Sequence, residues 1–140
     1  MEGAEQMTPF ALKIVTPDGL RYDGQAEELI VRTTSGDLGI LAGHVDCVAP
    51  LGMGRATVVI DGKHRYGACI GGMVTVVDSV VTLVSTTFEW AEQIDAARVE
   101  RAIEKAKAVL QDKHSSDTDL RLAEARLRRA LVRQSVASNK

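Results

Sequence analysis

Residues 55–70 read RATVVIDGKHRYGACI, and this stretch decides the fold class of the N-terminal part of the chain. Arg55–Ile60 is rich in β-branched residues, which favour a strand. Asp61-Gly62 follows, and this dipeptide favours the tight turns of β-hairpins because both central residues of such a turn adopt positive φ. His64–Ile70 then supplies a returning strand. The sequence therefore predicts an antiparallel β-hairpin here.

Further strand patterns lie on both sides of this hairpin. They are predicted over residues 10–15, 26–34, 73–77 and 80–85. Turn signals separate them at Thr16-Pro-Asp-Gly19 and Asp78-Ser79, and Gly71-Gly72 interrupts the strand that ends at Ile70. Loops this short leave no room for helical crossovers, so antiparallel pairing is expected. Residues 10–88 are therefore predicted to form an antiparallel β-sandwich or barrel.

The hydrophobic period changes near Glu89 from two residues to three or four. Asp95 can cap a helix, and apolar residues recur at helical spacing from there to about residue 112. A polar loop precedes a second amphipathic segment over about 119–134, and residues 135–140 are expected to fray. Two helices joined by a short loop normally lie antiparallel. The predicted fold class is α+β, with a flexible N-terminus at 1–9, the β domain at 10–88 and a C-terminal two-helix antiparallel hairpin at 89–140.

Charge divides between these two parts of the chain. Residues 1–93 carry 6 Lys and Arg against 12 Asp and Glu, whereas residues 94–140 carry 11 against 7. The basic hairpin is therefore either a differently solvated surface or a segment that binds an acidic protein, a nucleotide or nucleic acid. Its apolar stripes are narrow and rich in alanine, so two alternatives stand: the hairpin packs permanently on the β domain, or it opens.

The N-terminal residues contain Glu2 and Glu5 but no apolar run, so no secretory signal is expected. No stretch approaches the ~18 apolar residues that a membrane helix needs. Cys47 and Cys69 stand among small apolar residues and are expected in the core. No CxxC pair or histidine cluster indicates a metal. We expect a soluble chain in a reducing compartment, with no direct membrane insertion and no metal or prosthetic group.

Catalytic motifs are missing from the sequence. It contains no Gly-x-Ser-x-Gly, P-loop, HExxH or dinucleotide-binding fingerprint, so a non-catalytic, partner-binding protein is predicted. The segment Gly36-Asp-Leu-Gly-Ile-Leu-Ala-Gly-His44 interleaves glycines with apolar residues. Because glycine permits conformations that β-branched residues resist, this segment is either a bend where a strand crosses between two sheets or a contact loop.

Four motifs, taken in order, resemble those of the epsilon subunit of bacterial F-type ATP synthases. The resemblance spans about Phe10 to Val136. The family often has proline where this chain has Ala42 and Asp46, and phenylalanine where it has Met73, and these departures concern packing. The motifs are Ile14-Val-Thr-Pro-Asp-Gly19, Gly36-Asp-Leu-Gly-Ile-Leu-Ala-Gly-His44, Gly71-Gly72-Met73 and Glu89-Trp-Ala-Glu-Gln-Ile-Asp-Ala-Ala-Arg98.

The resemblance implies a non-catalytic central-stalk subunit of a proton-translocating ATP synthase, peripheral at the cytoplasmic face of the bacterial cell membrane. Its β domain would bind the gamma subunit and the loops of the c-subunit ring. Its hairpin would permit ATP hydrolysis when folded on the β domain, and inhibit hydrolysis when extended toward the alpha and beta subunits of the catalytic head. The residues implied to face the ring are Asp37, Leu38, Gly39, Ile40 and His44.

The resemblance also implies ATP as a regulatory ligand of the folded hairpin. The family motif Ile-Asp-x-x-Arg-Ala opens the first helix and here ends in Val99, a departure. Lys105 stands where some members have arginine, and lysine lacks the planar fork of the guanidinium. The nucleotide-binding residues implied by matched position are Glu89, Ile94, Asp95, Arg98, Val99, Arg129 and Arg133.

Helical spacing supports part of this assignment. Arg129 and Arg133 are four residues apart and share one face of the second helix, and antiparallel packing would bring them near Asp95 and Arg98. Arginine suits phosphate because it donates two parallel hydrogen bonds. The alternative is an ordinary salt bridge, such as one from Asp95 to Arg133. Nucleic-acid binding is not predicted, because the basic tail lacks interleaved aromatic residues and the β domain is acidic.

Overall fold

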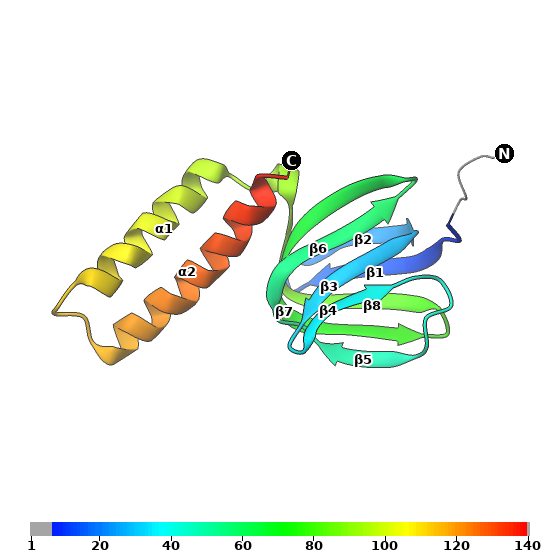
Figure 1. Ribbon diagram of the computed structural model, residues 1–140, viewed down its shortest axis with the longest axis horizontal. Coiled ribbons are helices and arrows are strands. Elements are labelled where there is room, and N and C mark those ends of the chain that lie inside the picture. Colours follow the sequence, from blue (N-terminus) through cyan, green and yellow to red (C-terminus); the bar gives the residue numbers. More distant parts are fainter. Residues whose placement is uncertain (1–6, 140) are drawn as a thin grey trace.

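The computed structural model describes residues 7–139 and contains a β domain followed by two helices (Figure 1). The N-terminal segment predicted to be flexible therefore lies mostly outside the described residues, as does Lys140. One curled 8-stranded sheet has the order β2-β1-β8-β7-β6-β3-β4, with β5 paired to β7. The strands are β1 Phe10–Thr16, β2 Gly19–Ala26, β3 Glu28–Thr33, β4 Gly36–Ile40, β5 Cys47–Pro50, β6 Met53–Ile60, β7 Lys63–Val77 and β8 Val80–Trp90.

Tight turns join successive strands where the sequence predicts them. The β6–β7 hairpin turns at Asp61 and Gly62, with φ of 52° and 76°. Asp78 and Ser79, with φ of 48° and 66°, make the turn between β7 and β8. Positive φ at both central residues matches the right-handed twist of the flanking strands. The central hairpin prediction is confirmed, and so is the turn that follows β1.

The sequence predicts that a strand is interrupted at Gly71-Gly72. In the structure β7 bends there and continues to Val77. Both glycines have positive φ, 69° and 112°, and a Cβ on Gly72 would lie 1.9 Å from the carbonyl oxygen of Val84. Before the bend β7 pairs with β6, and after it with β5, so the strand crosses here from one layer of the sandwich to the other. Of the two alternatives for residues 36–44, the bend between layers agrees in part with the structure. Residues 36–40 form the edge strand β4 beside β3, and the loop after them leads to β5, which pairs with β7 beyond its bend and so lies in the other layer.

One strand pair contradicts the expected antiparallel arrangement. β1 runs parallel to β8, with Leu12 opposite Val81 and Ile14 opposite Leu83. Short loops require antiparallel pairing only between strands that are neighbours in the sequence. β1 is the first strand of the β domain in the sequence and β8 is the last. The six strands between them form the long connection that parallel pairing requires. All the other strand pairs given by the ladder are antiparallel.

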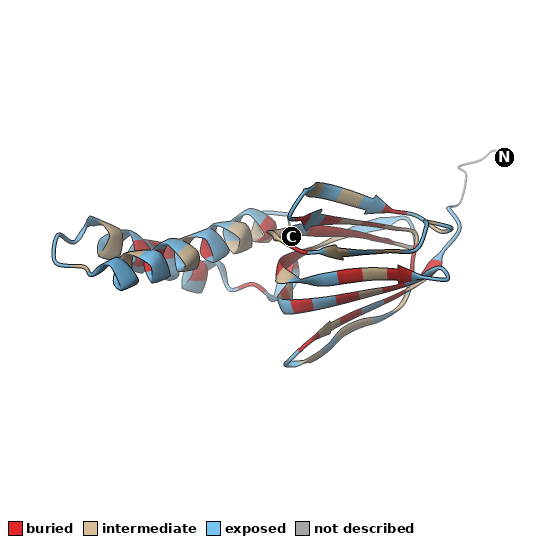
Figure 2. Ribbon diagram, turned by 90° about the horizontal axis from the view of Figure 1, so that it is seen from below, coloured by how far each residue is buried: buried red, intermediate tan, exposed pale blue. Residues whose placement is uncertain are grey.

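Alternation along the strands builds the core between the two layers. In β1 the side chains of Phe10, Leu12 and Ile14 are buried, while the residues between them are less so (Figure 2). Phe88 and Trp90 at the end of β8 close the core with rings in edge-to-face contact, 4.9 Å between centroids. This period of two is the reason that a mostly aliphatic sequence folds into a sandwich.

A short 3-10 turn, η1 Ala91–Gln93, leads into two antiparallel helices, α1 Ala96–Gln111 and α2 Asp117–Ala137. Asp95 caps α1 by accepting a hydrogen bond from the Arg98 amide at 3.2 Å, as predicted. Ser116 and Asp119 form a reciprocal capping box at the start of α2. The second helix is longer than predicted, because residues expected to fray after 134 remain helical as far as Ala137.

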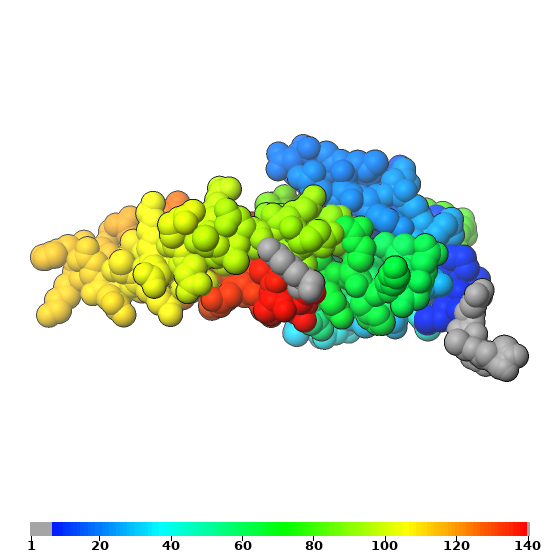
Figure 3. Space-filling model, turned by 90° about the horizontal axis from the view of Figure 1, so that it is seen from above, coloured from blue at the N-terminus to red at the C-terminus, as the bar shows by residue number. Residues whose placement is uncertain are grey.

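The hairpin rests on the β domain through α2. This helix contacts β6, β7 and η1, whereas α1 packs mainly on α2. Val136, near the end of α2, is fully buried in a second apolar cluster with Ala68 of β7 and Ile94. The loop between the helices lies at the far end of the molecule from the β domain (Figure 3). The hairpin is therefore held near its base and projects away from the sandwich.

Candidate functional site

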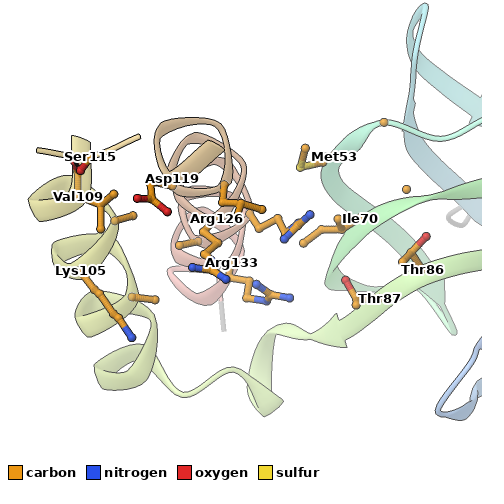
Figure 4. A pocket seen from close by; sticks show the side chains of 18 of the residues that line it. Met53, Ile70, Thr86, Thr87, Lys105, Val109, Ser115, Asp119, Arg126 and Arg133 are labelled. Atoms are coloured by element: carbon orange, nitrogen blue, oxygen red, sulfur yellow. Dashed lines mark hydrogen bonds between the residues drawn. The ribbon is translucent and has the colours of Figure 1, made fainter. Parts of the chain in front are cut away.

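A cavity of about 1240 Å³ lies between the helical hairpin and the β domain (Figure 4). One wall comes from both helices and their connecting loop. The other comes from the bend of β7 and the adjacent segments of β6 and β8. The strand wall consists of Leu51, Gly52, Met53, Ile70, Gly71, Thr86 and Thr87.

Four basic side chains line this cavity: Lys105 from α1, and Arg126, Arg129 and Arg133 from α2. Arg133 donates from Nε to Oε1 of Glu89 at 2.6 Å. Among the described residues, the side chains of the other three form no hydrogen bond or ion pair. Unneutralised cations around a cavity attract an anionic ligand, and arginines bind phosphate oxygens with paired hydrogen bonds.

The strand wall includes one threonine whose hydroxyl is buried. Thr87 and Glu89 are two residues apart on β8, so they share the face of the strand that meets the hairpin. The hydroxyl oxygen of Thr87 is buried and has no hydrogen-bond partner among the described residues. Ile70 lies opposite Thr87 in the ladder and gives the wall an apolar part. The cavity thus combines cations on the helix side with apolar surface on the strand side.

The structure brings together only some of the predicted nucleotide-binding residues. Arg129, Arg133 and Lys105 line the cavity, and Glu89 reaches it through its ion pair with Arg133. Asp95 caps α1, and the exposed Arg98 lies outside the lining. The alternative, an ordinary salt bridge, agrees in part with the structure: Arg133 does form one, but its partner is Glu89 and not Asp95.

Ile94 and Val99 are buried under the hairpin, at 2% and 7% exposure. Both belong to the apolar cluster that contains Val136, and neither lines the cavity. In this arrangement their side chains pack against residues of β7 and α2 and so fix the start of α1. The apolar cluster at the base of the hairpin therefore contains two residues that the family motif had assigned to the nucleotide.

Arg126 and Thr87 were not among the predicted site residues. The spacing of Arg126 from Arg129 and Arg133, three and seven residues, would have placed it on their face of the helix. Nothing in the sequence distinguishes Thr87 from the other threonines of β8, because the lack of a hydrogen-bond partner for its hydroxyl depends on the tertiary packing around it.

The segment predicted to face a membrane ring forms the edge strand β4 and the loop after it. Asp37 is exposed and pairs with Arg32 at 3.0 Å, Gly39 is exposed, and Leu38 and His44 are half-buried. Ile40 is fully buried, so its side chain does not face outward as predicted. Sequence reasoning missed the exposed apolar residues nearby, Leu41 and Val45, at 46% and 75%.

The outer face of the layer formed by β1, β8, β7 and β5 is apolar over several strands. Met73 lies opposite Val84, and Val84 lies opposite Val15. In the rows beside them Val77 faces Val80, and Val48 faces Thr75. Met73, Val84, Val77, Val80 and Val48 are between 44% and 63% exposed. A contiguous apolar patch of this kind marks a protein-binding surface.

The two cysteines differ in their surroundings. Cys69 is buried in the core, as predicted, and its sulfur lies 3.4 Å from the Ser85 hydroxyl. Burial raises the pKa of the Cys69 thiol, and the contact with Ser85 opposes that shift without cancelling it. Cys47 is only half-buried at the edge of the core. Neither is disulfide-bonded.

Comparison with known proteins agrees with this layout. Residues 9–91 match the model of the ATP synthase delta/epsilon chain beta-sandwich domain, and residues 92–138 match that of the delta/epsilon long alpha-helix domain. The ATP synthase epsilon chain of Ruminococcus albus is 43% identical over 136 residues, covering 96% of this chain and 100% of the relative. The epsilon chain of Bacillus velezensis is 44% identical over 133 residues, covering 95% and 100%.

Solved structures show the same fold at lower identity. A chain in the Euglena gracilis mitochondrial ATP synthase structure, described as OSCP/F1/c-ring, matches with a TM-score of 0.79 at 24% identity, covering 99% of this chain and 86% of that one. A chain in the Tetrahymena thermophila central stalk/c-ring structure matches with a TM-score of 0.57 at 12% identity, covering 95% and 99%.

No helix within residues 7–139 is both long and apolar enough to cross a bilayer. The two family matches leave almost none of the chain uncovered, and the relatives match along their whole length. The chain belongs to the delta/epsilon chain family of ATP synthases, and like the epsilon chains that it resembles it is a non-catalytic subunit of such a complex.

Proposed function

We propose that this chain is a rotor subunit that couples the membrane ring of a proton-translocating ATP synthase to its catalytic head. In this proposal the complex sits on the cell membrane, with the chain on its cytoplasmic face. The exposed apolar face of β1, β8, β7 and β5 supports docking on the gamma subunit, because neighbouring apolar side chains exposed on one face are typical of protein-binding surfaces. The edge strand β4 and the residues around His44 supply a separate contact for the loops of the ring.

The hairpin is the regulatory part of the proposal. One observation carries this regulatory role. The hairpin is attached to the β domain mainly through α2, and a basic cavity lies between the hairpin and the β domain. Released from the β domain, the hairpin would present its positive charge to acidic surfaces of the alpha and beta subunits and block hydrolysis there. Charge complementarity steers and registers such an interface.

ATP is proposed to hold the hairpin on the β domain. Lys105, Arg129 and Arg133 supply cations on the helix side of the cavity, and Glu89 orients Arg133 from the strand side. A ligand that binds only the docked arrangement shifts the equilibrium toward it. High ATP would then favour the non-inhibitory state.

Two measurements test these parts separately. Deleting residues 94–140 should raise the ATPase rate of the reconstituted complex, and an unchanged rate would remove the inhibitory role.

Calorimetric titration of the isolated chain with ATP should show binding that Arg129→Gln weakens. A wild-type chain that takes up no ATP at millimolar concentration would remove the nucleotide part and leave the rotor role untouched.

A further inference from the structure

Three arginines of α2 form one row along the cavity. Arg126, Arg129 and Arg133 stand at steps of three and four residues, so they share a helical face, and all three line the cavity. The row spans about 10 Å of helix axis at the standard rise. In Figure 4 the side chains of Arg126 and Arg133 extend from α2 toward the strand wall with Met53, Ile70 and Thr87. Such a row can follow a chain of phosphate groups.

The two ends of the row differ in charge. Arg133 is partly neutralised by Glu89, whereas Arg126, at the other end, has no acidic partner among the described residues. Two turns before Arg126 the lining becomes acidic, with Asp119. A phosphate chain running along α2 away from Glu89 would therefore meet its last cation at Arg126 and be repelled beyond it.

We propose that Arg126 binds the terminal phosphate of the nucleotide and makes the cavity sensitive to the number of phosphates. This inference rests on the proposed nucleotide binding and goes beyond it by assigning a residue and an orientation. The base end of the nucleotide lies toward Glu89 and the phosphate end toward the interhelical loop. A nucleoside triphosphate reaches Arg126, whereas a monophosphate is held by Arg129 and Arg133 and does not.

The chain offers a matched control for this residue. Arg128 is also an exposed arginine of α2, two residues further on, and it points to the other side of the helix, outside the cavity lining. Arg126→Gln and Arg128→Gln remove the same charge from the same helix. Only the first removes a charge from the cavity, so general effects of charge on the chain cancel in the comparison.

The test is calorimetric titration of the full chain with ATP, ADP and AMP, using wild type, Arg126→Gln, Arg126→Lys, Arg128→Gln and Arg129→Gln. Arg126→Gln should weaken ATP binding about tenfold, the size of a lost hydrogen-bonded charge contact, and leave AMP unchanged. Arg126→Lys should recover part of the loss because it keeps the charge. Arg128→Gln should bind all three like wild type, and circular dichroism verifies that every variant is helical.

Each result decides something different. Equal ATP affinity in wild type and Arg126→Gln, alongside weaker binding by Arg129→Gln, would overturn the role of Arg126 and keep the proposed nucleotide site. An equal loss for ATP, ADP and AMP would overturn the phosphate-counting role. A wild-type chain that binds no ATP would overturn both the inference and the nucleotide part of the proposed function.

Discussion

Arg133 of α2 and Glu89 of β8 are joined by a hydrogen-bonded ion pair, Nε to Oε1 at 2.6 Å, that connects the hairpin to the β domain. The two residues are 44 positions apart in the chain. Their side chains are 26% and 40% exposed, so water screens the pair only in part. The pair stands at the cavity, where it holds the hairpin and at the same time positions one of the basic side chains.

Glu89→Gln should loosen the docked hairpin without unfolding the β domain. A partly exposed ion pair contributes about 1 kcal/mol, so amide hydrogen exchange in the last two turns of α2 should quicken about fivefold. The exchange of β1 amides serves as the internal reference. Asp37→Asn breaks the exposed pair with Arg32 inside the β domain and is the matched control. Equal exchange in all three proteins would show that the Arg133–Glu89 pair does not hold the hairpin.

Val136→Ala should weaken docking more than any exposed apolar substitution on α2. Val136 is fully buried near the end of the helix, and losing buried methyl groups costs about 1–2 kcal/mol together with the space left behind. Leu131→Ala, at a residue 44% exposed, is the control. Limited trypsin digestion reads out the difference, since α2 carries many arginines. If Leu131→Ala is cut as fast as Val136→Ala, the buried residue is not the anchor.

Much of this architecture could be predicted from the sequence. The Asp61-Gly62 turn, the strand alternation and the Asp95 cap are local signals, and all three were confirmed. The parallel pairing of β1 with β8 and the crossing of β7 at Gly71-Gly72 were not predicted, since both depend on how the sheet curls. The end of α2 was misjudged because burial of Val136 against the β domain, and not helix propensity, keeps residues after 134 helical.

The candidate site was only partly predictable for the same reason. Periodicity placed Arg129 and Arg133 on one face, and the structure puts both in the cavity. Burial of Ile94 and Val99 could not be read from a matched motif, because it depends on which side of α1 meets α2. The contact between Arg133 and Glu89 joins two elements whose relative position no local pattern fixes.

Thr87→Val should make the ligand-free chain more stable. The Thr87 hydroxyl is buried without a partner among the described residues, so replacing it by a methyl group of similar size removes a desolvation cost. We expect the free energy of unfolding to rise by about 1 kcal/mol in a urea titration. Thr87→Ser keeps the hydroxyl, loses the methyl group and should be less stable than wild type. A destabilised Thr87→Val would mean that the hydroxyl has a partner in solution.

Only Cys47 should react with a thiol reagent in the folded chain at pH 8. Burial raises the pKa of the Cys69 thiol above its unfolded value, so the folded state retains the proton. The stability that the folded state gains from retaining this proton is fully present below the pKa of the thiol in the unfolded chain. It is lost as pH rises through the pKa of the thiol in the folded chain. Absorbance after adding the reagent should report one fast thiol in buffer and two in urea. Fast labelling of Cys69 in the folded chain would contradict its burial.

In the proposed function, the docked hairpin permits ATP hydrolysis and the released hairpin inhibits it. The ATPase rate of complexes reconstituted with Val136→Asp tests this most directly, because a buried charge at the anchor releases the hairpin while leaving its basic face intact. We expect an ATPase rate below wild type for Val136→Asp and above wild type for the chain that ends at Gln93. A Val136→Asp complex that hydrolyses ATP as fast as wild type, or faster, would contradict it.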